Sequence, residues 1–208
     1  TRFVFRRFIL ESDYAARQAI DVLELVHEGK LPFDRTMRIS TAEENAKQKV
    51  ASRIPVNVKT IKTLLAANEA DWDKCEEGGL EKKERDLILK SMQSRRRKIA
   101  TLLEECCLRT AKIQPLLRKL QSISKKFKQI KRDMAYAKKH KSQFEPDDLF
   151  VMQEEMAGLR RLVLESPEQL DDRLKRIDVV FEEYDQGKRD LSGGNLRLVV
   201  SMAKKYRN

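Results

Sequence analysis

The sequence predicts an all-α protein, an elongated bundle of several long, charged helices that includes an antiparallel helical hairpin. Charged residues make up 37% of the 208 residues, above the roughly 25% typical of globular domains. Hydrophobic residues make up 40%, which is enough for a buried core. The seven glycines, five prolines and low aromatic content of 6% argue against a sandwich, a barrel or a parallel sheet.

The N-terminal part reads as one amphipathic helix followed by a loop. Apolar residues recur at helical spacing over residues 2–28, which predicts a helix with one buried face. Gly29 follows directly, and glycine enters the left-handed region that ends many helices without a Cβ clash. Residues 31–39, with Pro32 among them, are expected to form a loop.

Two further helices are expected before residue 80. Ser40 begins the first of them, with Glu43 three residues later as its capping-box partner. Pro55 is expected to end that helix, because proline lacks the backbone donor that a helix interior needs. A third helix then covers residues 56–76 and stops at Gly78.

The longest apolar pattern begins at Leu80 and has heptad spacing. Its steps alternate between three and four residues, at Ile99, Leu102, Cys106, Ile113, Leu116, Leu120, Ile123, Phe127, Ile130, Met134 and Ala137. Arg109 interrupts the pattern and Pro115 lies inside it, so we expect two helices or one kinked helix, with the break around residues 109–115. A bundle core within one chain is favoured over a free oligomerising coiled coil.

The C-terminal part contains three more helix starts. Pro146 suits a first helical turn. Ser166 is a strong cap, because proline and then glutamine follow at the positions where a helix start favours them. We expect this helix to run to about residue 186, with Gly187 after it. A last helix is expected to begin near residues 190–192, or as late as Asn195, because two glycines precede that residue.

Charge is unevenly distributed along the chain, whose formal net charge is +11. Residues 81–141 contain 20 Lys and Arg against 6 Asp and Glu, a net of +14, and residues 145–190 contain 7 against 14, a net of −7. The basic segment is either a solvated helix face or a surface that contacts phosphates. Its densest run is Arg95, Arg96, Arg97 and Lys98.

Residue patterns typical of enzymes are missing from the sequence, so we expect that the protein is not an enzyme and needs no cofactor or metal. There is no phosphate-binding glycine loop, no metal-ligand spacing and no nucleophile motif. The three cysteines, Cys75, Cys106 and Cys107, form no disulfide framework, and we expect reduced thiols in a cytoplasm. No apolar run approaches the roughly 18 residues of a membrane span.

The most specific motif lies at the C-terminal end. Residues 195–206 read Asn-Leu-Arg-Leu-Val-Val-Ser-Met-Ala-Lys-Lys-Tyr. This run resembles the opening helix of the second conserved domain of bacterial sigma-70-type transcription initiation factors of the primary, housekeeping kind. Its apolar residues Leu196, Val199, Val200, Ala203 and Tyr206 form one stripe suited to burial. At residues 192–194 the sequence is Ser-Gly-Gly, where the family usually has a helix-forming stretch.

The resemblance implies a domain organisation. Residues 1–190 would be the non-conserved helical insertion of primary sigma factors, with residues 1–10 as a possible tail of the preceding conserved region. Residues 191–208 would begin the second domain. The chain would then be a fragment, expected to be monomeric.

The resemblance also implies a function. The whole protein would bind core RNA polymerase, including its β′ clamp, and would direct it to promoter DNA in a bacterial cytoplasm. Residues matching Asn195 and Leu198 help to line a pocket for a base flipped from the −10 element. Possible DNA or polymerase contacts are Arg197, Lys204 and Lys205, and also Arg95, Arg96, Arg97 and Lys98 of the basic segment.

Two other readings remain open. The chain could be a basic helical module that assembles with a protein partner through its heptad seam. It could also be a helical protein that binds nucleic acid without sequence preference, which would show as a steep salt dependence.

Overall fold

The computed structural model of the protein describes residues 2–39, 44–140 and 145–205, and these ranges form an all-α structure, as the sequence predicts. The helices are α1 (Arg2–Leu10), α2 (Asp13–His27), α3 (Phe33–Thr36), α4 (Glu44–Glu77), α5 (Lys82–Glu105), α6 (Thr110–Lys139), α7 (Pro146–Val163) and α8 (Pro167–Lys205). Within these ranges the only β pairing is an isolated bridge between Met37 and Leu108.

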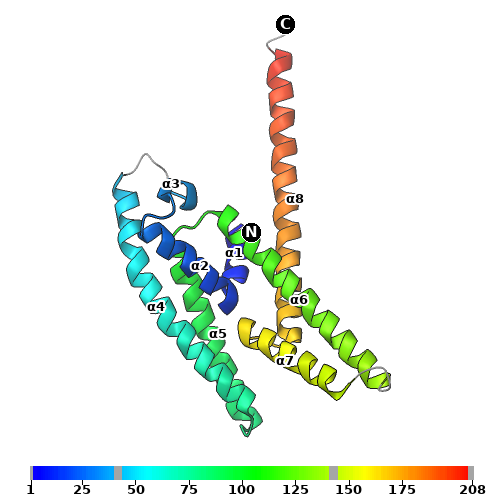
Figure 1. Ribbon diagram of the computed structural model, residues 1–208. Helices are drawn as coiled ribbons and strands as arrows, with labels where there is room; N and C mark the ends of the chain where they lie inside the picture. Colours follow the sequence, from blue (N-terminus) through cyan, green and yellow to red (C-terminus); the bar gives the residue numbers. More distant parts are fainter. Residues whose placement is uncertain (1, 40–43, 141–144, 206–208) are drawn as a thin grey trace.

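The helices α1 and α2 lie at the centre of the body (Figure 1). The antiparallel hairpin of α4 and α5 packs on one side of them, and α6, α7 and the first half of α8 pack on the other. The second half of α8 extends away from this body (Figure 1). No described helix combines the length and the apolar character that crossing a membrane requires.

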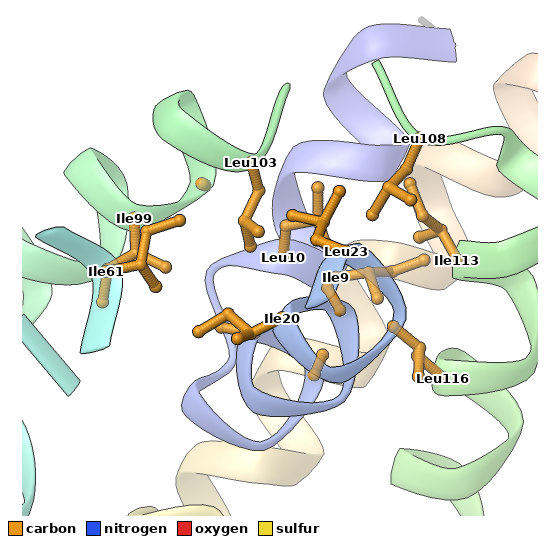
Figure 2. Packing of buried hydrophobic residues seen from close by; sticks show 14 of the residues in the cluster. Ile9, Leu10, Ile20, Leu23, Ile61, Ile99, Leu103, Leu108, Ile113 and Leu116 are labelled. Atoms are coloured by element: carbon orange, nitrogen blue, oxygen red, sulfur yellow. The ribbon is translucent and has the colours of Figure 1, made fainter. Parts of the chain in front are cut away.

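The core forms where α1 and α2 meet the helices on both sides, as Figure 2 shows. Burying a leucine or isoleucine side chain stabilises the fold by about 1.5–3 kcal/mol. Core side chains that are at most 1% exposed include Ile9, Leu10, Leu23, Ile61, Ile99, Leu103, Leu108 and Ile113. Most of the heptad positions lie in this core, so the seam faces the chain's own helices.

The N-terminal segment forms two helices, and the prediction of one helix over residues 2–28 was wrong. The chain turns at Ser12, whose hydroxyl oxygen accepts a hydrogen bond from the backbone N–H of Ala15 at 3.5 Å. Serine is a favoured N-cap because it satisfies a donor that the helix leaves free. The prediction for Gly29 is confirmed, since its φ is +73°.

The helix α4 continues past Pro55, so the prediction that this residue ends a helix was also wrong. A proline in a helix interior costs about 3 kcal/mol. Val50 and Ile54 lie before the proline and Val58 and Ile61 after it, and all four are buried in the same core. Their combined burial outweighs the proline. The helix ends before Gly78 and Gly79, which have φ of +81° and +83°.

The long heptad region is divided into two helices, one of the two predicted outcomes, and the break lies at the start of the predicted range and before Pro115. It falls between Glu105 and Thr110, where Cys107 has a φ of +57°. The segment before α4 holds this break in place. The N–H of Arg38 donates to the carbonyl of Cys107 at 2.7 Å, and the N–H of Arg109 donates to the carbonyl of Thr36 at 2.9 Å.

Two of the three predicted helix starts after residue 145 are confirmed. Pro146 occupies the first turn of α7. At the start of α8, the Ser166 hydroxyl accepts from the N–H of Gln169 at 3.2 Å, and the Gln169 side chain accepts from the N–H of Ser166 at 2.9 Å. This is the reciprocal arrangement of a capping box.

The helix α8 continues through Gly187 and the glycine pair at 193 and 194, so the predicted stop at Gly187 and the later start near 190–195 were wrong. Each glycine costs roughly 1 kcal/mol in a helix interior but does not forbid one. The Gln186 amide donates to the Asp190 carboxylate at 2.9 Å across one turn, and such pairs support a helix. The predicted capping box at Ser40 and Glu43, and Tyr206, lie outside the described residues.

Replacing Pro55 by alanine is expected to stabilise the protein by about 1–3 kcal/mol, because the helix interior regains a hydrogen-bond donor and loses a clash. Urea unfolding followed by circular dichroism measures this change. Pro167→Ala is the control, since Pro167 occupies the first position of α8, where no donor is lost. Equal effects of the two substitutions would contradict the interpretation.

Candidate nucleic-acid interface

No described helix packs against the C-terminal half of α8, residues 186–205 (Figure 1). We call it distal α8. Among the described side chains of α8, Ile177 is the last that is buried, and those from residue 189 to residue 204 are all exposed. At 1.5 Å per residue, distal α8 is about 30 Å long.

A broad apolar face covers about half of the circumference of distal α8. With 100° per residue, the apolar side chains fall within an arc of about 200°. They are 47–69% exposed at Leu191, Leu196, Leu198, Val199, Val200 and Met202. An exposed apolar surface of this extent on one helix is typical of a contact face.

The two predicted base-pocket residues lie next to each other on this face. Asn195 and Leu198 are three residues apart, which places their Cβ atoms about 5–6 Å from each other on a helix. Both are exposed. The amide can donate and accept hydrogen bonds at a base edge, and the leucine can pack against a ring.

The predicted basic contacts of distal α8 lie outside the apolar arc. Arg197 and Lys204 are exposed on the narrow polar face. Lys205 is the last residue of α8. The polar face of the helix could therefore contact phosphates while the apolar face contacts another surface.

The predicted contact Arg96 is buried and bonded within the chain instead. Its side chain donates to the Asp13 carboxylate at 2.5 Å and to the carbonyl of Leu164 at 2.7 Å. Asp13 also accepts from the Asn68 amide at 2.6 Å. Arg96 therefore has no surface from which to reach an external phosphate.

Arg95 is engaged by the same network. It donates to the Asn68 side-chain oxygen at 2.6 Å and to the Asp71 carboxylate. Of the four residues of the basic run, Arg97 and Lys98 alone are exposed. These two remain the candidate contacts on α5.

Arg97 borders a polar cavity of about 240 Å³ between α1, α5 and α8. A buried ion pair lies in the wall of this cavity, where Arg173 donates to Glu165 at 2.5 and 2.9 Å. Burial works against the charge of Arg173, but the Glu165 carboxylate more than offsets it and raises the pKa of Arg173. Arg173 also donates to the carbonyl of Phe8 at 3.3 Å, which ties the base of α8 to α1.

The acidic segment neutralises one face of the basic segment. Lys126 pairs with Glu155 at 2.8 Å, Lys128 pairs with Asp171 at 2.5 Å, and Lys131 pairs with Glu168. The hydrogen bond from Lys131 lowers the pKa of Glu168 below its ordinary value. Because these pairs are exposed, each is worth about 0.2–1 kcal/mol. Their main effect is to remove net positive charge from the face of α6 that meets α7 and α8.

Cys106 is a core residue. Burial raises the pKa of its thiol from 9.0 to about 11, although the Asn57 amide, 3.8 Å from the sulfur, acts in the other direction. A thiol of this kind is neither a nucleophile nor a metal ligand at neutral pH. Within the described ranges, no group of His, Cys, Asp and Glu side chains is placed to hold a metal ion.

Comparison with known proteins adds no assignment. No protein-family model matches the chain, and no curated protein is significantly similar to it.

Replacing Arg96 by alanine is expected to destabilise the protein by about 3–5 kcal/mol, because the Asp13 carboxylate would remain buried without its partner. Urea unfolding measures the loss, or native circular dichroism if the variant does not fold. Lys98→Ala removes an exposed charge two residues away and is expected to change stability by less than about 0.5 kcal/mol. A loss below about 1 kcal/mol for Arg96→Ala would contradict the role of this pair.

Alkylation of Cys106 is expected to require high pH. Only the thiolate reacts, so the rate in the folded protein should rise around pH 11, and in urea it should rise around pH 9.0. The unfolded chain loses this proton first, so the stability that the buried thiol contributes is complete below pH 9.0 and declines towards pH 11. Iodoacetamide labelling followed by peptide mass spectrometry tests this, and a folded-state profile centred near pH 9.0 would refute it.

Proposed function

We propose that this chain is part of a sigma-70-type transcription initiation factor, which binds core RNA polymerase and takes part in recognition of the −10 promoter element. Distal α8 would be the opening helix of the second conserved domain. The helices before it would be the insertion that primary sigma factors carry. The factor would supply specificity to the polymerase and catalyse no reaction itself.

The observation that carries the proposal is the exposed pair of Asn195 and Leu198 on distal α8. In the family that the sequence resembles, the residues at these two positions line the pocket for a flipped base. A pocket wall needs a polar edge and an apolar surface on the same side of one helix, and this pair provides both. Arg197 and Lys204, on the polar face of the same helix, are suited to phosphate contacts.

The wide apolar face of distal α8 supports the same proposal. A recognition helix that works alone does not need an apolar arc of about 200°. Such an arc suits a helix that packs on further helices, as the opening helix of a multi-helix domain must. The proposed division at residue 190 falls inside α8, so one uninterrupted helix would join the insertion to the second domain.

The body of the chain fits the role of an insertion. It has its own core, and its heptad seam is buried within that core. This argues against the alternative of a module that assembles through the same seam. Binding of nucleic acid without sequence preference remains the alternative to distinguish by experiment.

Photo-crosslinking tests the proposal. A benzophenone side chain is placed at residue 198, and the chain is mixed with bacterial core RNA polymerase and a labelled non-template strand that carries a −10 element. We expect a crosslink that depends on both the polymerase and the −10 sequence. The control position is Val200, which lies about 160° around the same helix from residue 198. We expect little crosslinking from residue 200.

The substitution Asn195→Ala is expected to reduce the preference for the −10 sequence about 5-fold to 150-fold, as the loss of one base-edge contact worth about 1–3 kcal/mol. Equal crosslinking to a scrambled strand, or crosslinking that does not need the polymerase, would favour the alternative of non-specific binding.

The chain alone is expected to bind the −10 strand weakly, because other walls of the pocket would come from further helices. Tight, sequence-specific binding by the chain alone would contradict that view.

A further inference from the structure

Four basic residues form a straight row on the outer face of α6. Arg118, Lys125, Arg132 and Lys139 are spaced seven residues apart, and all four are exposed. We call them the α6 basic row. Seven residues are almost two turns of a helix, so these side chains lie on one side at intervals of about 10 Å and span about 31 Å.

The α6 basic row makes no ion pair within the described residues, in contrast to three other basic residues of α6. Lys126, Lys128 and Lys131 flank the buried face and meet the acids of α7 and α8. Within the described part of the chain, no member of the row has an ion-pair partner. Arg132 donates only to neutral groups, the Lys128 carbonyl at 3.3 Å and the Gln129 side chain at 3.0 Å.

Neutral hydrogen-bonding side chains alternate with the charges of the row. Ser122, Gln129 and Tyr136 each lie four residues after a basic member, and all three are exposed. Asp133 is the one acidic residue of α6, and its carboxylate accepts a hydrogen bond from Gln129 at 2.8 Å. The outer face of α6 therefore combines cations with the hydroxyl and amide groups that commonly contact phosphates.

We propose that the α6 basic row binds the phosphate backbone of duplex DNA without reading its sequence. A long row of cations free of acids matches a polyanion with closely spaced phosphates. Its span of about 31 Å is close to one turn of B-form DNA, about 34–36 Å. A straight helix and a stiff duplex also meet without the ordering cost that a flexible single strand would add.

An acidic protein partner fits this face less well. Protein interfaces depend on buried aromatic or aliphatic anchors near their centre. The outer face of α6 has Tyr136 as its one large apolar side chain, at the end of the row, where it stacks on His140 with ring centroids 4.1 Å apart. The inference does not depend on the proposed function of distal α8, because it concerns a different helix and requires no sequence preference.

Fluorescence anisotropy with a labelled 20-base-pair duplex of arbitrary sequence tests the proposal. The row variant R118Q/K125Q/R132Q/K139Q is compared with K49Q/K59Q/K82Q/K83Q. The control variant removes the same number of positive charges from exposed positions on α4 and at the start of α5. Glutamine is a good helix former, so both variants are expected to keep the native circular dichroism spectrum.

The salt dependence gives the expected magnitude. Four phosphate contacts correspond to a slope of about −3.6 in a plot of log affinity against log salt concentration, or about 150-fold weaker binding between about 50 and 200 mM salt. We expect the row variant to bind far more weakly and to lose about 3.6 units of slope, while the control variant keeps most of both. Equal losses in the two variants, or no binding by the unchanged chain at low salt, would overturn the proposal.

A second measurement separates DNA from an acidic protein partner. Polyglutamate of matched charge replaces the duplex as the labelled probe. We expect the unchanged chain to bind the duplex more tightly than polyglutamate at equal salt. If the row substitutions weaken polyglutamate binding but leave duplex binding unchanged, the row is a protein contact and the proposal is wrong.

Discussion

The buried pair of Asp13 and Arg96 is the interaction on which the arrangement of the body depends. Asp13 is the first residue of α2, and it accepts hydrogen bonds from Asn68 of α4 and from Arg96 of α5. Arg96 also donates a hydrogen bond to the carbonyl of Leu164. Leu164 ends α7 in the left-handed conformation, with a φ of +53°. Four helices therefore meet at one pair of charges. Such a pair adds little net stability against an apolar replacement, but its partners are costly to separate and so define which helix ends come together.

The same network changes the meaning of the chain's positive charge. Arg95 and Arg96 belong to the densest basic run, yet both are used to hold helices together. The lysines of α6 that face the acidic segment are neutralised within the chain. The net charge of +11 therefore overstates the number of basic side chains that are free to contact another molecule, and the outer face of α6 is one surface where such side chains remain. Charge counted along a sequence locates a segment, and packing decides which of its residues face solvent.

Features that depend on local chemistry were predictable from the sequence. The cap at Ser166, the end of a helix at Gly29 and the break of the heptad region each follow from residues close together in the chain. The course of α4 through Pro55 and of α8 through Gly187 was not predictable in this way. These residues cost only about 1–3 kcal/mol in a helix interior. Burial in the shared core outweighs this cost for α4, and α8 stays helical in spite of it.

The placement of the candidate contacts was predictable only in part. Asn195 and Leu198 are exposed, and so are the other described side chains from residue 189 to residue 204, so their role stays a prediction. The burial of Arg96 was missed, although a signal exists, because Ile99, Ala100 and Leu103 follow it at helical spacing and are buried on the same face. The α6 basic row was missed too, and its seven-residue spacing was the signal. No local pattern could identify the acidic partner of a basic residue such as Arg96, because Asp13 lies 83 residues from it.

Because α8 is one unbroken helix, the distance of distal α8 from the body and its rotation about the helix axis change together. Because one helix carries both the residues packed in the body and the exposed face near its end, each residue added between them would move that face about 1.5 Å outward and turn it by about 100°. A change of one residue would point Asn195 in a different direction, whereas a change of seven would shift it by about 10 Å and nearly restore its direction. The length of this stretch thus sets the angle at which the body meets whatever distal α8 contacts.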